Sequence, residues 1–177
     1  MRTEIRKIQQ KVGITAIYVT HDQSEAMALS DNIIIMNKGV VAQMGTPQEV
    51  YYQPADEFVA DFIGEANFLK GALVRIDGNY AVLNVEGNEI KAAKKDDMEI
   101  GKEYTVVLRP EAARLADEGG IPCKVNLSCF MGSYQNYHVM VGDTLVKLEE
   151  PNPRNKKVYE VNETCQLVFD PDSVHVL

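Results

Sequence analysis

The sequence predicts a short α/β segment followed by an all-β domain, and the change falls near residue 65. Before that point, apolar runs alternate with segments that carry helix-capping residues and helical apolar spacing. After it, short apolar runs are separated by turn residues such as the Asp-Gly-Asn of residues 77–79, which is typical of a sandwich or small barrel. We therefore expect two domains, residues 1–64 and residues 65–177.

The first elements place a histidine at the end of a strand. Residues 3–12 show helical apolar spacing. The run 14–20 is apolar without polar alternation, which predicts a strand buried on both faces of a parallel sheet. Asp22 can cap a following helix, with Glu25 at the capping-box spacing. His21 would then project from the carboxyl end of a strand, where open α/β sheets bind their ligands.

The rest of the first segment continues the alternation of strands and helices. Residues 32–36 and 40–42 predict two strands joined by the Asn-Lys-Gly turn of residues 37–39. Thr46 caps another helix, because proline follows at the first helical position and glutamate at the third. The apolar stripe within residues 58–63 predicts a last helix whose stripe is core packing.

The second segment reads as a series of short strands. One run, residues 123–129, alternates strictly, with Cys123, Val125, Leu127 and Cys129 on one face. We expect both cysteines in the core, because a free cysteine behaves as a small hydrophobe. The other expected strands are 73–76, 80–85, 104–108, 139–141, 144–148 and 166–169.

Composition narrows the function classes. The net charge of −8 argues against a nucleic-acid surface, and the basic stretch 154–157 is isolated and fits a solvated loop. No run of about 18 apolar residues is present, so we expect no membrane-spanning helix. Three cysteines without a Cys-x-x-Cys or Cys/His cluster predict neither a disulfide framework nor a metal site.

Residues 19–26 (Val-Thr-His-Asp-Gln-Ser-Glu-Ala) resemble the switch-histidine segment of ATP-binding-cassette (ABC) importer ATPases. The resemblance continues in order and spacing through residues 35–39, 43–51 and 58–64. In that family the histidine contacts the γ-phosphate of ATP, and the resemblance implies this role for His21. A hydrolase in which His21 and Asp22 act together as a general base is disfavoured, because no nucleophile and no set of metal ligands accompanies them at a defined spacing.

Other family motifs are absent from this sequence. It contains no Gly-x-x-x-x-Gly-Lys-Ser/Thr phosphate loop, no Leu-Ser-Gly-Gly-Gln signature and no strand ending in an Asp-Glu pair. In the family these motifs precede the switch histidine. We therefore expect the C-terminal portion of a P-loop ATPase subunit, which does not hydrolyse ATP alone. The resemblance implies ATP and Mg²⁺ as cofactors of the full-length subunit only.

The second segment resembles the TOBE domain, an OB-like β-barrel appended to importer ATPases. The resemblance rests on residues 108–111 (Leu-Arg-Pro-Glu), 130–133 (Phe-Met-Gly-Ser) and 169–176 (Phe-Asp-Pro-Asp-Ser-Val-His-Val). It implies candidate ligand or interface residues, which are Arg109, Glu111, Gly132 and Ser133. The alternative is structural: an Arg109–Glu111 pair and a turn that needs small residues. Likewise, Tyr134, Tyr137 and His138 could form an aromatic ligand surface, but alternating strand faces favour packing.

The resemblance also implies partners, location and cargo. The partners are a second copy of the ATPase subunit and the membrane permease subunits, with no nucleic acid. The location is cytoplasmic, peripheral on the inner face of the cell membrane. The short segment after Gly64 is more similar to the corresponding segment of polyamine, ferric-iron or phosphonate importers than to that of sugar importers. A sugar importer is kept as an alternative. The alternative from another class is a stand-alone small-anion-binding or regulatory OB-like module.

Overall fold

The computed structural model describes residues 2–177, with side chains from Glu4 onward, and the chain folds as two compact units. The N-terminal unit ends at Gly64, and the β unit comprises residues 65–177. No helix in the described part of the chain is both long and apolar enough to cross a bilayer.

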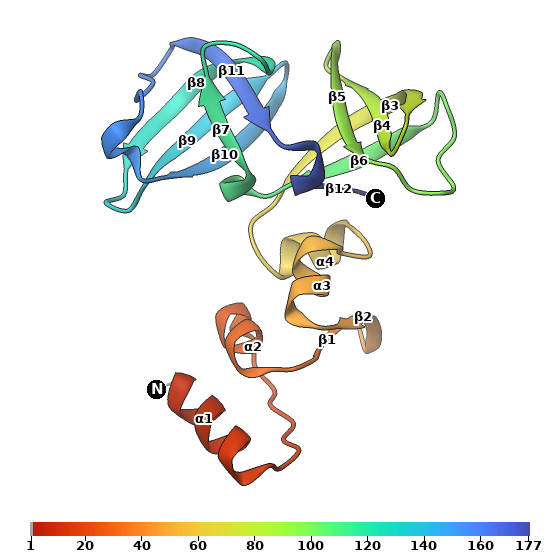
Figure 1. Ribbon diagram of the computed structural model, residues 1–177, viewed down its shortest axis with the longest axis vertical. Helices are drawn as coiled ribbons and strands as arrows, with labels where there is room; N and C mark the ends of the chain where they lie inside the picture. The colour runs from red at the N-terminus through yellow and green to blue at the C-terminus, as the bar shows by residue number, and fades with distance from the viewer. Residues whose placement is uncertain (1) are drawn as a thin grey trace. The chain divides into compact units, whose positions relative to one another are not determined.

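The N-terminal unit consists of short helices and one β-hairpin (Figure 1). Its elements are α1 (Arg2–Val12), α2 (Gln23–Leu29), β1 (Ile33–Asn37), β2 (Val40–Gly45), α3 (Pro47–Tyr52) and α4 (Glu57–Phe62). The small core joins the hairpin to the last two helices through Ile33, Ile35, Val50, Val59 and Ile63.

Local sequence signals explain where these helices begin and end. α1 stops at Gly13, whose φ of +69° favours glycine. The Asp22 carboxylate accepts the Glu25 N–H at 3.1 Å and caps α2. Thr46 and Glu49 form the expected capping box before α3, with Pro47 at its first position.

The prediction of a strand at residues 14–20 is wrong for the described part of the chain. Residues 14–20 are extended but belong to no sheet, and β1 and β2 pair only with each other. Ile17 is 93% exposed and Val19 is 91% exposed. A strand forms only where neighbouring strands accept its backbone hydrogen bonds, and none lies beside this segment among residues 2–177. The α/β character of the unit is therefore weak.

The β unit contains two curled five-stranded antiparallel sheets, which resemble two half-barrels (Figure 1). One sheet has the order β12-β6-β3-β4-β5 and the other β10-β9-β8-β11-β7. The strands are β3 (Asn67–Asp77), β4 (Tyr80–Val85), β5 (Asn88–Ala93), β6 (Glu103–Leu108), β7 (Ala113–Ala116), β8 (Ile121–Phe130), β9 (Tyr134–Val141), β10 (Thr144–Pro151), β11 (Thr164–Phe169) and β12 (Val174–Val176). Short 3₁₀ turns lie at η1 (Pro110–Ala112), η2 (Pro153–Asn155) and η3 (Pro171–Ser173). The all-β expectation is confirmed at this level.

A β-bulge in β8 corrects the expected core face. Cys123 and Val125 are buried as expected, but Leu127 and Cys129 are exposed. Val125 pairs with Val139 while Leu127 pairs with His138, so the register shifts between them. A bulge inserts one extra residue and reverses the faces of the residues after it.

Asn67 ties the two sheets of the β unit together. Its amide nitrogen donates to the Leu108 carbonyl at 3.1 Å and to the Lys147 carbonyl at 2.8 Å. Its amide oxygen accepts the Lys147 N–H at 2.7 Å. Asn67 lies in β3 and Lys147 in β10, so this buried side chain connects strands of different sheets.

Candidate functional site

His21 lies between the extended segment and α2, and its side chain is exposed. The residues around it are fixed by side-chain hydrogen bonds. Thr20 Oγ1 accepts the Asp22 N–H at 2.9 Å and donates to the Glu25 carboxylate at 2.9 Å. Tyr18 donates its hydroxyl to the same carboxylate at 3.1 Å. His21 is therefore presented to solvent from a backbone that its neighbours hold in place.

An ion pair links the first helix to the end of α2. The Arg6 guanidinium donates to the Leu29 carbonyl at 3.0 Å and pairs with Asp31. The hydrogen bond from Arg6 holds the pKa of the Asp31 carboxyl below its usual range, and the pKa of Arg6 is raised in return. Asp31 is therefore an anion under physiological conditions and stabilises the position of α1.

The surface around this helix pair is apolar. Exposed side chains from the extended segment and from β1 line a groove together with α1, and they include Ile14, Ile17, Val19, Ile34 and Met36. Contiguous exposed apolar surface of this kind is typical of interfaces.

The candidate residues of the β unit fall into two groups. Arg109 is 4% exposed, and its guanidinium donates to the Glu65 carbonyl at 3.0 Å, whereas Glu111 is exposed in η1. Gly132 and Ser133 form the turn between β8 and β9 and are both exposed. Gly132 has a φ of +87°, so the turn needs glycine for its backbone rather than for space.

The aromatic residues of β9 do not form one exposed surface. Tyr137 is 1% exposed, its hydroxyl accepts the Tyr159 N–H at 3.3 Å, and burial raises its pKa. Tyr134 and His138 are half-buried. Tyr137 therefore packs in the core, as the alternation of strand faces favoured.

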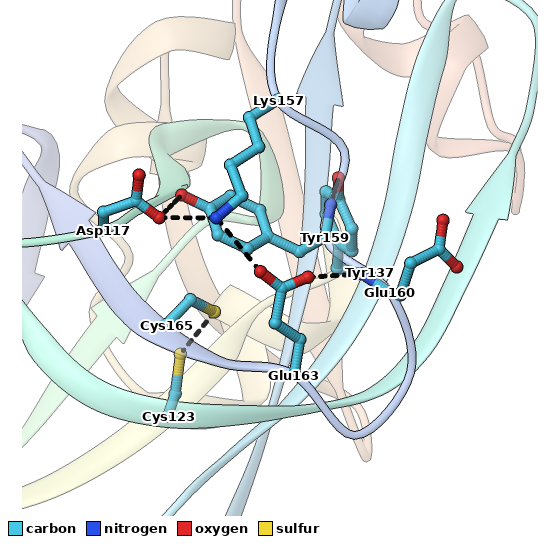
Figure 2. Close-up of polar contacts among 8 residues, drawn as sticks. All are labelled: Asp117, Cys123, Tyr137, Lys157, Tyr159, Glu160, Glu163 and Cys165. Atoms are coloured by element: carbon cyan, nitrogen blue, oxygen red, sulfur yellow. Dashed lines mark hydrogen bonds and ion pairs between the residues drawn. The ribbon is translucent and has the colours of Figure 1, made fainter.

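Sequence reasoning missed a polar cluster that covers part of the second sheet (Figure 2). The Lys157 ammonium contacts Asp117 at 2.7 Å and Glu163 at 3.0 Å, and it lies 4.3 Å from the centroid of the Tyr159 ring. Tyr159 donates its hydroxyl to Asp117 at 3.1 Å. Lys157 belongs to the basic stretch that was expected to be a solvated loop. No spacing signal could have found the two contacts to Asp117, because Lys157 and Tyr159 follow it by 40 and 42 positions.

This cluster changes the acidity of its members. The hydrogen bonds from Lys157 and then Tyr159 lower the pKa of Asp117. A hydrogen bond from the Glu160 N–H, followed by Lys157, lowers the pKa of Glu163. Burial, followed by the bond to Asp117, raises the pKa of Tyr159 to about 12. The cluster is a charged network at neutral pH and holds the loop before β11.

Comparisons with known proteins bear on the whole chain. Residues 106–177 match the TOBE domain family. All of the chain aligns, at 38% identity, with Spermidine/putrescine import ATP-binding protein PotA 1 of Pseudomonas aeruginosa, of which it covers 49%. The corresponding identities are 37% for PotA of Pseudomonas fluorescens and 36% for PotA of Borreliella afzelii, each again aligned with all of the chain and covered to 49%.

The chain is similar over its whole length to the C-terminal halves of ABC importer ATP-binding subunits. It spans about half the length of the curated relatives it matches, and it corresponds to their C-terminal halves. The expected resemblance, including the TOBE domain, is therefore confirmed.

A solved structure supports the fold. The cytoplasmic molybdate-binding protein ModG, solved with molybdate bound, matches with a TM-score of 0.51 over 62% of this chain and 94% of that chain. The sequence identity of 12% limits this likeness to the fold. Within residues 2–177, no group of three or more His, Cys, Asp or Glu side chains is placed to hold a metal ion.

Proposed function

We propose that this chain is the C-terminal part of the ATP-hydrolysing subunit of an ABC import system. In this proposal the N-terminal unit is the end of the nucleotide-binding domain and the β unit is the TOBE-type accessory domain. The supporting observation is the similarity of the whole chain to import ATP-binding proteins. The exposed His21, held between an ordered backbone and a capped helix, supports the same proposal.

His21 acts in this proposal as the switch residue at the γ-phosphate of ATP. Phosphoryl transfer places negative charge on the transferred group and its neighbours, and enzymes accelerate it by positioning and electrostatic stabilisation. An exposed imidazole can donate a hydrogen bond to that charge. The phosphate loop, the signature and the acidic pair for Mg²⁺ are not in this sequence. ATP and Mg²⁺ are therefore ligands of the full-length subunit, and this chain alone is inactive.

The imported solute is a polyamine in this proposal. The relatives are named as spermidine/putrescine import proteins, and these names favour a polyamine over ferric iron, phosphonate or sugar. The partners are membrane permease subunits and a second copy of the subunit, at the inner face of the membrane. Glu111 and Ser133 contribute to the partner-facing surface of the β unit together with Gly132, while the buried Arg109 acts by holding the Glu65 backbone.

A histidine exchange tests the role of His21. The exchange is made in a full-length subunit, in which the part with the phosphate loop precedes this chain. There, His21→Ala should lower the rate of ATP hydrolysis by about 10²- to 10³-fold. ATP binding should survive, because the contact serves charge that develops during transfer. His138→Gln, which changes a half-buried histidine of β9, is the matched control. Unchanged hydrolysis in His21→Ala would reduce His21 to a structural residue.

A further inference from the structure

The strongest unassigned feature is a pair of buried thiols in the second sheet. Cys123 in β8 and Cys165 in β11 face each other directly across two antiparallel strands. Their Sγ atoms are 3.6 Å apart, and each residue is 6% exposed (Figure 2). Nothing in the proposed transport function uses this pair.

The geometry of the pair suits a covalent bond. Directly opposite residues in an antiparallel sheet have Cα atoms about 4.5–5.5 Å apart, which lies within the range of about 4.4–6.8 Å found for disulfides. The sulfur atoms need only approach from 3.6 Å to the bond length of about 2.05 Å. Side-chain rotation supplies this movement, because the strands are already in register.

The polar cluster lies beside the pair (Figure 2). Tyr159 packs in the same core as both cysteines, and Lys157 lies over its ring. Lys157, Asp117 and Glu163 are close enough to Cys165 to influence its ionisation. Lys157 joins Asp117, which follows β7, to Glu163, which precedes β11. We name Asp117, Lys157, Tyr159 and Glu163 the cover.

We propose that Cys123 and Cys165 form a modification site, at which a low-molecular-weight disulfide converts the two thiols into a cross-strand disulfide when the cover opens. One thiolate attacks the small disulfide and forms a mixed disulfide, and one small thiolate leaves. The second cysteine thiolate then attacks the mixed disulfide and displaces the other small thiolate. The two cysteines together lose two protons and two electrons, and one small disulfide is reduced to two thiols.

Burial keeps the site unreactive while the cover is closed. Desolvation raises the pKa of Cys123 and of Cys165, so both thiols are protonated in the closed state. Opening of the cover admits water and the reagent, and both effects increase the reaction rate. Cys129 is exposed and provides an internal reference for an accessible thiol.

Oxidised glutathione is a suitable probe. The chain with Cys129→Ser is incubated with it in native buffer, and mass spectrometry follows the loss of about 2 Da that marks an intramolecular disulfide. We expect this product, with a peptide that joins Cys123 to Cys165. Lys157→Met should accelerate its formation several-fold. Lys91→Met is the matched control, because Lys91 forms an exposed ion pair with Asp77 at 2.7 Å in the other sheet.

Two results would overturn the proposal. The first is a pair that stays as two thiols in both the Cys129→Ser protein and its Lys157→Met variant, under conditions in which Cys129 of the unchanged chain is fully converted to a mixed disulfide. The second is an equal acceleration of disulfide formation by Lys157→Met and Lys91→Met, which would show that the cover does not control the reaction. Circular dichroism of each variant distinguishes a specific opening of the cover from general unfolding.

Discussion

Removal of the Asn67 side chain should destabilise the β unit strongly. Asn67 is 6% exposed and makes three hydrogen bonds that connect β3 with β6 and with β10 of the other sheet. A typical hydrogen bond contributes about 1 kcal/mol net, and a buried group left without its partner costs about 1–3 kcal/mol. Asn67→Ala removes all three bonds at once, so we expect a loss of about 2–4 kcal/mol in the free energy of unfolding.

Urea denaturation measures this loss. The chain contains no tryptophan, so circular dichroism of the β signal is the appropriate readout. Asn126→Ala is the matched control, because Asn126 is exposed at the bulge of β8, and it should change stability by about 0.5 kcal/mol or less. A loss for Asn67→Ala that equals the loss for the control would show that Asn67 does not tie the sheets together, and the reasoning would be wrong.

Three further predictions concern other parts of the chain. The isolated chain should release no phosphate from ATP and Mg²⁺ above a His21→Ala control, and clear turnover would contradict the missing-motif argument. Backbone amides of residues 14–20 should exchange with deuterium faster than those of Val139 and Val141, and the exposed Ile17 and Val19 should promote self-association that light scattering detects; slow exchange in a monomer would refute this. The pKa of Asp117 is depressed from 3.8 by Lys157, so its stabilising contribution is present above that pH and is lost as pH falls through the lower folded value. The free energy of unfolding of Lys157→Met should therefore fall less than that of the unchanged chain as the pH is lowered. An identical dependence on pH in the two proteins would count against the Lys157–Asp117 contact.

Local signals in the sequence predicted much of the fold. Capping residues placed α2 and α3 correctly, since a cap depends only on residues three positions apart. Turn residues also marked most strands of the β unit. The failures involve contacts between distant residues. The segment 14–20 has the composition of a buried strand, but a strand needs neighbours, and the described chain places none beside it.

The same distinction explains the results for the candidate sites. Strict period-2 alternation predicted that Cys129 lies in the core, and this prediction is wrong. The alternation holds only while the register is constant, and the bulge near Asn126 is not visible as a pattern in the sequence. The facing of Cys123 and Cys165 depends on the register of strands 42 residues apart. By contrast, the prediction for His21 rests on its neighbours in the sequence. It stays a prediction, with which the exposed position of His21 is compatible.

The most direct test of the account is ATP-driven uptake by the assembled importer. The full-length subunit and its permease are reconstituted in vesicles with a polyamine-binding component, and uptake of labelled spermidine is measured together with phosphate release. We predict that uptake requires ATP, and that His21→Ala lowers both signals by about 10²- to 10³-fold while ATP binding persists. His138→Gln should leave both signals unchanged. Spermidine uptake that continues at the normal rate in His21→Ala would contradict the switch role, and ATP-driven uptake that excludes spermidine would contradict the assignment to polyamine import.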